Sequence, residues 1–186
     1  MSNLCFVTFL SLKNTPLAFL TAYSYERLNV LHQVAGYSTV FWVLLHGVIY
    51  IIAWVKTDNL EELLEKTQVM GITAGFAFLV ILATALFLRR RRYEVFYIIH
   101  IVMFMLILVL VGMHRPDLGT KAAIVVIFTA SIWAADRAFR FAKISLFSFG
   151  NTATITPLPH GGTHIALKRS SGRAVAGTHY FLVSRD

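Results

Sequence analysis

Four of the seven histidines stand at matched positions in two long uncharged stretches. His32 and His46 are 14 residues apart in one stretch, and His100 and His114 are 14 residues apart in the other. On an α-helix, 14 residues turn through about 1,400°, which leaves the two rings about 40° apart on one face and about 21 Å apart along the axis. Imidazole is the commonest protein ligand for metals. Each stretch is therefore predicted to be a helix that presents one metal-ligating ring near each end, on one face.

The stretches that carry these histidines belong to a chain with the composition of a membrane protein. Its 186 residues are 57% hydrophobic and 14% charged, whereas soluble chains are about 45 to 50% apolar and about 25% charged. A spanning helix needs about 20 mostly apolar residues. Three uncharged runs reach this length: residues 29–55, 67–88 and 95–114. A fourth run, residues 122–135, is shorter, but Arg137 and Arg140 after it can extend to the interface. We predict an all-α membrane bundle.

The positive charge of the chain gives its expected orientation. The net charge is +8, and the basic residues gather at the ends of the apolar runs, so they indicate topology and not a nucleic acid partner. Nine of them lie on one side of the predicted bundle and four on the other: Lys13, Arg27, residues 89–92, Arg137, Arg140 and Lys143 against Lys56, Lys66, Arg115 and Lys121. The positive-inside rule puts the first group in the cytoplasm, and both histidine-bearing spans then run outward.

Two parallel spans bring their histidines together in pairs. His32 can face His100 near the inner side, and His46 can face His114 near the outer side, because both pairs are offset by 68 residues. Haem suits two such sites, since its iron takes an axial ligand on each face. Zinc suits them less well, because two imidazoles supply half of a tetrahedral shell. We predict two b-type haems; taken singly, any of these histidines could instead be a hydrogen-bonded contact between helices.

Cations and small residues stand close to the histidine positions. Arg27 and Arg92 flank the inner end of the histidine face, and Arg115 and Lys121 flank the outer end. They are candidates for charge-assisted hydrogen bonds to the haem propionates, and interfacial anchoring is the alternative. The sequence GITAG at residues 71–75 is a GxxxG pattern, which favours close approach of two helices.

Both ends of the chain differ from the central spans. The apolar stretch from Leu4 to Leu12 has no basic region before it and no cleavage site after it, so we expect a severed membrane helix and not a signal peptide. Alternating apolar and polar stretches at residues 151–159, 162–170 and 177–186 predict β-strands. We therefore predict a transmembrane haem domain over residues 1–145 and a β-rich segment over 146–186, too short to close a barrel.

Two segments carry a family resemblance. SLKNTPLAFLTAYSYERLNVLHQVAGYSTVFWVLLHG and YEVFYIIHIVMFMLILVLVGMHRP closely resemble the transmembrane domain of fungal ferric reductases, which are related to the NADPH oxidases. The resemblance covers roughly residues 5–145, and the tail looks like the first strands of the flavin-binding barrel. It implies that the four histidines ligate two haems, which pass electrons from a cytoplasmic FAD and NADPH module to ferric or cupric chelates outside. It also implies a multi-pass protein of the plasma membrane.

The sequence departs from that family at two places. Many members have a basic residue directly after the first histidine, where this chain has Gln33. The chain also ends at Asp186, before the flavin and nucleotide motifs, so FAD and NADPH are expected of the complete oxidoreductase and not of this segment. Two alternatives stay open at this point: a superoxide-producing NADPH oxidase, and a haem-free accessory membrane protein.

Overall fold

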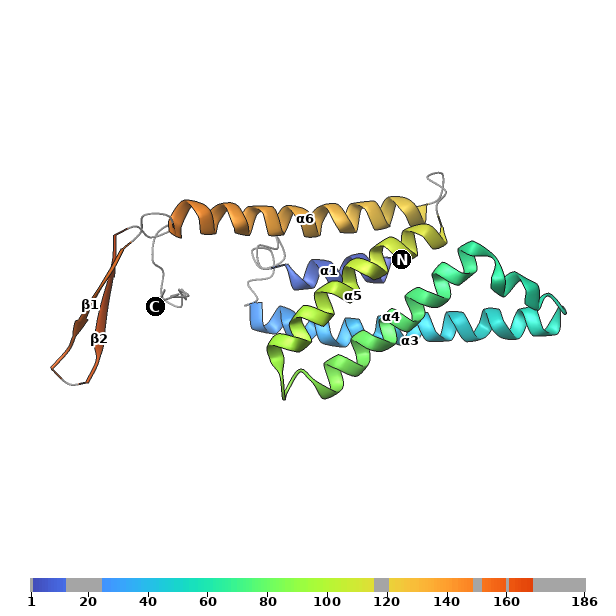
Figure 1. Ribbon diagram of the computed structural model, residues 1–186, viewed down its shortest axis with the longest axis horizontal. Coiled ribbons are helices and arrows are strands. Elements are labelled where there is room, and N and C mark those ends of the chain that lie inside the picture. Colours follow the sequence, from blue (N-terminus) through green and yellow to red (C-terminus); the bar gives the residue numbers. More distant parts are fainter. Residues whose placement is uncertain (1, 13–24, 116–120, 149–151, 160, 169–186) are drawn as a thin grey trace. The chain divides into compact units, whose positions relative to one another are not determined.

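Helices form most of the chain. The computed structural model describes residues 2–12, 25–115, 121–148, 152–159 and 161–168. They divide into two compact units, residues 1–136 and 137–186. The elements in chain order are α1 (Ser2–Ser11), α3 (Tyr25–Lys56), the 3-10 helix η1 (Leu60–Leu64), α4 (Lys66–Phe87), α5 (Tyr93–His114), α6 (Lys121–Ser148), β1 (Ala153–Pro157) and β2 (Thr163–Leu167) (Figure 1).

Among the described residues, four helices are long and apolar enough to cross a membrane, as predicted. They extend over Arg27–Lys56, Lys66–Phe87, Tyr93–His114 and Lys121–Leu146. The last is longer than the predicted run of residues 122–135, because α6 continues without a break through the charged residues that follow. Figure 1 shows that α3 and α5 run in the same direction and that α4 runs the opposite way. The two histidine-bearing helices are therefore parallel.

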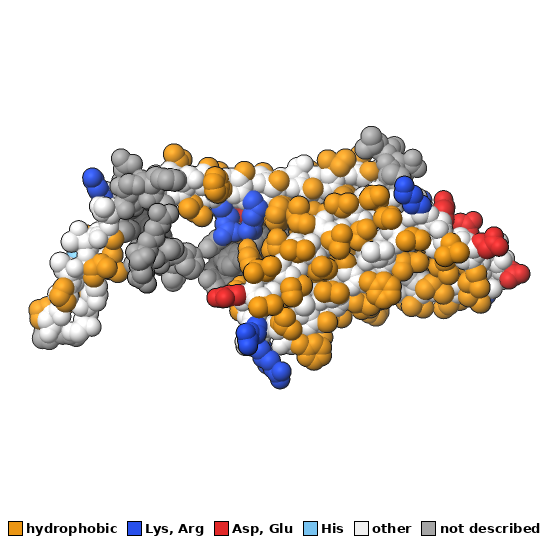
Figure 2. All heavy atoms as spheres, viewed as in Figure 1, with side chains coloured by type: hydrophobic (Ala, Val, Ile, Leu, Met, Phe, Trp, Pro, Cys, Tyr) orange, Lys and Arg blue, Asp and Glu red, His pale blue; other side chains and the backbone are white. Residues whose placement is uncertain are grey.

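The first unit has a small apolar core and an apolar surface. Helix α4 packs most closely on α5, and α1 packs on α3. The core takes side chains from α1 and all four long helices, among them Leu4, Val40, Phe78, Ile107 and Val126. Hydrophobic side chains also cover much of the outer face of the helices (Figure 2). Such a surface suits a hydrocarbon solvent, which requires backbone polar groups to bond internally, as they do in helices.

The second unit contains an antiparallel hairpin. Strand β1 pairs with β2 in a register that puts Ala153 opposite Leu167 and Ile155 opposite Ile165. Gly161 in the connection has a φ of 81°, a conformation that glycine adopts without strain. The strands predicted within residues 151–159 and 162–170 are thus confirmed, and the stretch 177–186 lies outside the described residues. That this hairpin begins a flavin-binding barrel, with a boundary at residue 145, stays a prediction.

Candidate haem-ligating site

Helices α3 and α5 bring His32 and His100 together. The centres of the two imidazole rings are 6.1 Å apart and their planes make an angle of 67°. An iron between two imidazole nitrogens would put the ring centres roughly 6 Å apart, since each metal–nitrogen bond is about 2 Å long and each ring centre lies about 1 Å behind its nitrogen. The spacing of this inner pair, as we call His32 and His100, therefore fits one metal ion held from both sides.

The ring of His32 is held in a defined orientation by α1. Its Nδ1 lies 2.9 Å from the backbone carbonyl oxygen of Val7. A carbonyl can only accept a hydrogen bond, so Nδ1 is the protonated nitrogen and Nε2 keeps its lone pair. Metal-ligating histidines commonly donate their other ring N–H to a carbonyl or carboxylate, which fixes the ring and makes it a stronger ligand. His32 has the tautomer that ligation through Nε2 requires.

The ring of His100 contacts aromatic groups. Phe96, one turn earlier on α5, has its ring centre 5.3 Å from that of His100. The Nδ1 atom of His100 is buried and has no hydrogen-bond partner among the residues that the structure describes. Buried polar atoms are normally paired. An unpaired buried nitrogen beside a second imidazole is therefore compatible with a ligand set that binds a group from outside the chain.

The second pair, His46 and His114, is arranged more loosely. His46 lies close enough to His114 and Arg115 for their charges to interact. Its ring packs on Tyr50, one turn later on its own helix, with 4.6 Å between the ring centres. Within the described residues a ring contact joins His32 to His100 but not His46 to His114. The structure thus brings the rings of His32 and His100 into contact, whereas among the described contacts His46 and His114 are linked only by the interaction of their charges. We call His46 and His114 the outer pair.

Helix α4 fixes the ring of His114. Nδ1 of His114 lies 2.7 Å from the carbonyl oxygen of Thr67, so the tautomer argument made for His32 applies again. The ring also lies directly against Gly71, where a Cβ atom would come within 2.6 Å of Nδ1. Sequence reasoning missed the carbonyls of Val7 and Thr67, because every residue has a backbone carbonyl and only the fold brings these two to the rings.

The cations near the pairs differ in part from those predicted. Arg89 donates from Nη1 to Oε1 of Gln33 over 2.5 Å, and its charge acts on His32. Gln33, at the position where many family members have a basic residue, therefore contacts the guanidinium of Arg89 from the turn after α4. Sequence reasoning missed Arg89 because nothing distinguishes it from the other three arginines of its run. Of the predicted cations, Arg115 lies near His46. Arg27, Arg92 and Lys121 are exposed.

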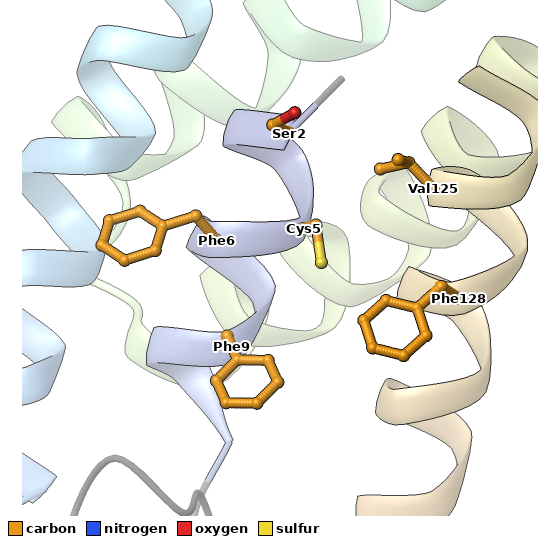
Figure 3. Close-up of a pocket in the computed structure, with 6 residues that line it drawn as sticks. All are labelled: Ser2, Cys5, Phe6, Phe9, Val125 and Phe128. Carbon is orange, nitrogen blue, oxygen red and sulfur yellow. The ribbon is translucent and has the colours of Figure 1, made fainter. Parts of the chain in front are cut away.

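The donor set suits a haem more than a bare metal ion. In the described part of the chain no three His, Cys, Asp or Glu side chains lie close enough together to hold a metal. Porphyrin supplies four nitrogens of its own and needs only two axial protein ligands. An apolar pocket between α1 and the start of α6 is lined by Ser2, Cys5, Phe6, Phe9, Val125 and Phe128 (Figure 3). No histidine lines this pocket, so it is separate from the paired rings.

Residues 1–111, more than half of the chain, match the family described as "Ferric reductase like transmembrane component". The chain belongs to this ferric reductase-like transmembrane family. The match covers α1, α3, α4 and most of α5, and it includes His32, His46 and His100, whereas His114 lies just beyond its end. Together with the four long apolar helices, family membership makes the chain a multi-pass membrane protein.

Fungal metalloreductases are among the relatives of this ferric reductase-like chain. "Ferric/cupric reductase transmembrane component 2" of Schizosaccharomyces pombe is 32% identical over 136 residues, 71% of this chain and 23% of that protein. "Probable ferric reductase transmembrane component" of Candida albicans is 26% identical over 180 residues, 91% of this chain and 25% of that protein. The chain therefore spans about a quarter of the length of these curated relatives. No solved structure matches it significantly.

Proposed function

We propose that this chain is the membrane electron-transfer core of a metalloreductase, which reduces ferric or cupric chelates outside the cell with electrons from cytoplasmic NADPH and FAD. The observation that carries the proposal is the inner pair: two imidazoles from parallel spanning helices, 6.1 Å apart, in a member of the ferric reductase-like family. Packing alone does not require a polar ring on each of two apolar helices at the same depth. Intramembrane ionisable residues are costly and commonly functional.

In this proposal each pair binds one b-type haem, His32 with His100 on the inner side and His46 with His114 on the outer side. Haem supplies reversible one-electron chemistry when bound. The histidines act as axial ligands through Nε2 and transfer no proton. The carbonyls of Val7 and Thr67 support this role, because they hold Nδ1 of His32 and of His114 in the protonated form.

The depth of the two pairs explains why two sites are needed. Histidines 14 residues apart on one helix are separated by about 21 Å along the axis, which is most of the hydrocarbon thickness of about 30 Å. Hydride cannot cross hydrocarbon, whereas an electron can pass between two fixed redox centres. If both histidines of the outer pair held one haem iron, no coordination position would be left for a chelate, and its reduction would then be outer-sphere.

Basic side chains at both ends would bind the carboxylate edges of the cofactors. Arg27 and Arg92 remain our candidates on the inner side, and Arg115 and Lys121 on the outer side. Arg89 joins the inner group, because its guanidinium is held beside His32 by Gln33. Charge-assisted hydrogen bonds from arginine are about twice as strong as neutral ones. The positive-inside rule puts the arginine run in the cytoplasm. An acceptor outside the cell would then require the protein to lie in the plasma membrane.

A visible spectrum tests this proposal. The chain is produced with a supply of haem and purified in detergent. Paired imidazole ligation predicts a sharp Soret band and resolved α and β bands after reduction with dithionite, with two haems per chain. A folded protein without these bands would exclude the haem proposal and leave a haem-free accessory role.

The identity of the acceptor needs a second assay. Sealed vesicles that contain the haem-loaded chain are filled with dithionite, and ferric citrate is added outside under nitrogen and then under air. A metalloreductase core forms ferrous iron at similar rates under both gases. Formation of superoxide under air at the expense of ferrous iron would instead favour an oxidase.

A further inference from the structure

The contact between His114 and α4 extends beyond ordinary helix packing. Gly71 belongs to the GITAG sequence, whose small residues are typical of close helix pairs. A Cβ atom at Gly71 would lie 2.6 Å from Nδ1, 2.7 Å from Cε1 and 3.1 Å from Cγ of His114. All three atoms belong to one imidazole ring. The space that a side chain at Gly71 would occupy is therefore taken by the ring of His114, not by the backbone of a neighbouring helix.

The second glycine of the same pattern behaves differently. A Cβ atom at Gly75, one turn further along α4, would meet nothing within 4 Å. A general need for small residues between helices would make both positions crowded. Only Gly71 is crowded, and the crowding group is a predicted haem ligand. This difference indicates that Gly71 makes room for the ring of His114 and does not serve helix packing in general.

The two contacts of His114 together define how the ring lies. The carbonyl of Thr67 accepts the hydrogen bond from Nδ1, and Gly71 gives the ring the room to reach that carbonyl. Because the Thr67 carbonyl is bonded to Nδ1, Nε2 is the ring nitrogen that is left to act as a ligand. We propose that Gly71 and the Thr67 carbonyl form a seat that positions His114 as an axial ligand of the outer site; this inference rests on the proposed function.

A side chain at Gly71 would disturb the ring before it disturbs the helix. Alanine favours a helix more than glycine does, so the backbone of α4 tolerates Gly71→Ala. The ring of His114 has two rotatable bonds and is the part that moves. The movement breaks the hydrogen bond to Thr67 and displaces Nε2 from the outer site. Loss of such a supporting contact typically weakens metal binding about 10- to 100-fold.

The test compares Gly71→Ala with Gly75→Ala in the full chain loaded with haem. We expect Gly75→Ala to keep the wild-type haem content and spectrum. We expect Gly71→Ala to lose up to half of the haem, as we also expect of His114→Ala, or to keep it with an altered potential and low-spin EPR signal of one haem. Unchanged haem content, potentials and EPR signals in Gly71→Ala would overturn the inference, whereas a wild-type protein without haem would overturn the proposed function itself.

A double variant keeps the test decisive if Gly71→Ala does not accumulate in the membrane. Removal of the ring in His114→Ala also removes the clash, so Gly71→Ala/His114→Ala should accumulate and bind haem as His114→Ala does. An additional loss in the double variant, in haem content or in accumulation, would show that Gly71 serves something other than the ring and would contradict the proposed seat.

Discussion

The inner and outer histidine pairs have the same sequence spacing but different surroundings. In the inner pair the rings of His32 and His100 contact each other at 6.1 Å. In the outer pair His114 lies against α4, and the exposed ring of His46 packs on Tyr50 of its own helix. Both pairs nevertheless share one feature: one ring of each donates to a backbone carbonyl of a helix without a ligand, α1 for His32 and α4 for His114.

Two helices that carry no predicted ligand, α1 and α4, each hold one histidine ring in place. Helix α1 supplies the carbonyl of Val7 and α4 supplies that of Thr67, so each fixes one ring of one pair. The other ring of each pair, His100 or His46, makes no such hydrogen bond to a carbonyl among the described contacts. In the proposed haem sites, a fixed ring facing a more adaptable one would let each pair bind its haem while one ring keeps its orientation. Damage to α1 should then affect the inner site, and damage to α4 the outer site.

Loss of a ligand should have the largest effect. His100→Ala leaves His32 without its partner, so we expect about half of the haem to be lost and electron transfer across vesicles to fall at least about 100-fold, the upper end of the effect of supporting groups. The measurements are the haem-to-protein ratio and ferrous iron formation. His164→Ala is the control, since this exposed histidine lies in the hairpin and contacts Thr156. Retention of both haems in His100→Ala would contradict the pairing.

Weakened docking of α1 should affect the inner site alone. Leu10 is 2% exposed and Phe6 is 54% exposed on the same helix. Leu10→Ala removes buried packing, and the shift of the Val7 carbonyl should weaken inner haem binding about 10-fold. Haem loss during dilution series, followed by absorbance, measures this effect. Phe6→Ala should leave it unchanged. An equal loss of both haems in Leu10→Ala would show that α1 supports the bundle generally and not His32.

Arg89 and Arg90 should differ in their effect on the redox potential of the inner haem, and this effect should be smaller than those above. A positive charge beside a redox centre favours its reduced form, so Arg89→Gln should lower the potential of the inner haem by a few tens of mV, where 59 mV corresponds to a tenfold change for one electron. Redox titration with optical detection measures both potentials. Arg90→Gln should change neither by more than a few mV, because Arg90 is exposed, whereas Arg89 is half-buried against Gln33. Equal shifts in both variants would indicate only long-range charge.

The acidic residues of η1 should matter least. Glu61 and Glu62 are exposed on this short helix, in agreement with the solvated charged face that their spacing suggests. Exposed charges interact weakly at physiological salt. Glu61→Gln/Glu62→Gln should therefore change the rate of ferric citrate reduction less than about twofold. A larger, salt-sensitive change would assign these carboxylates to capture of the external chelate.

The sequence predicted the elements of the membrane unit well, for a physical reason. Uncharged runs of about 20 residues have few stable alternatives to a spanning helix. The predicted run at residues 67–88 corresponds to α4, and that at 95–114 to α5, within two residues at each end. Periodicity along each helix also indicated that His32 and His100 could share a depth, and the structure brings their rings together. Their role as haem ligands stays a prediction.

The contacts that hold the rings could not be read from the sequence. Val7 lies in α1, which the sequence predicted only as a severed membrane helix, and its carbonyl has no side-chain signature. Gly71 was visible only as half of a GxxxG pattern, and the pattern cannot show that one glycine faces a ring and the other faces open space. Arg89 is one of four consecutive arginines, and only the tertiary structure shows that its side chain, and not that of a neighbour, reaches Gln33. Each of these contacts depends on tertiary packing.

Haem counting in two double variants tests the pairing most directly. His32→Ala/His100→Ala removes both proposed ligands of the inner pair, so the chain should keep one low-spin haem, as either single variant should. His32→Ala/His114→Ala removes one ligand from each pair, so the chain should keep none. One haem retained by the second variant, or none by the first, would contradict the assignment of these four histidines to an inner and an outer site.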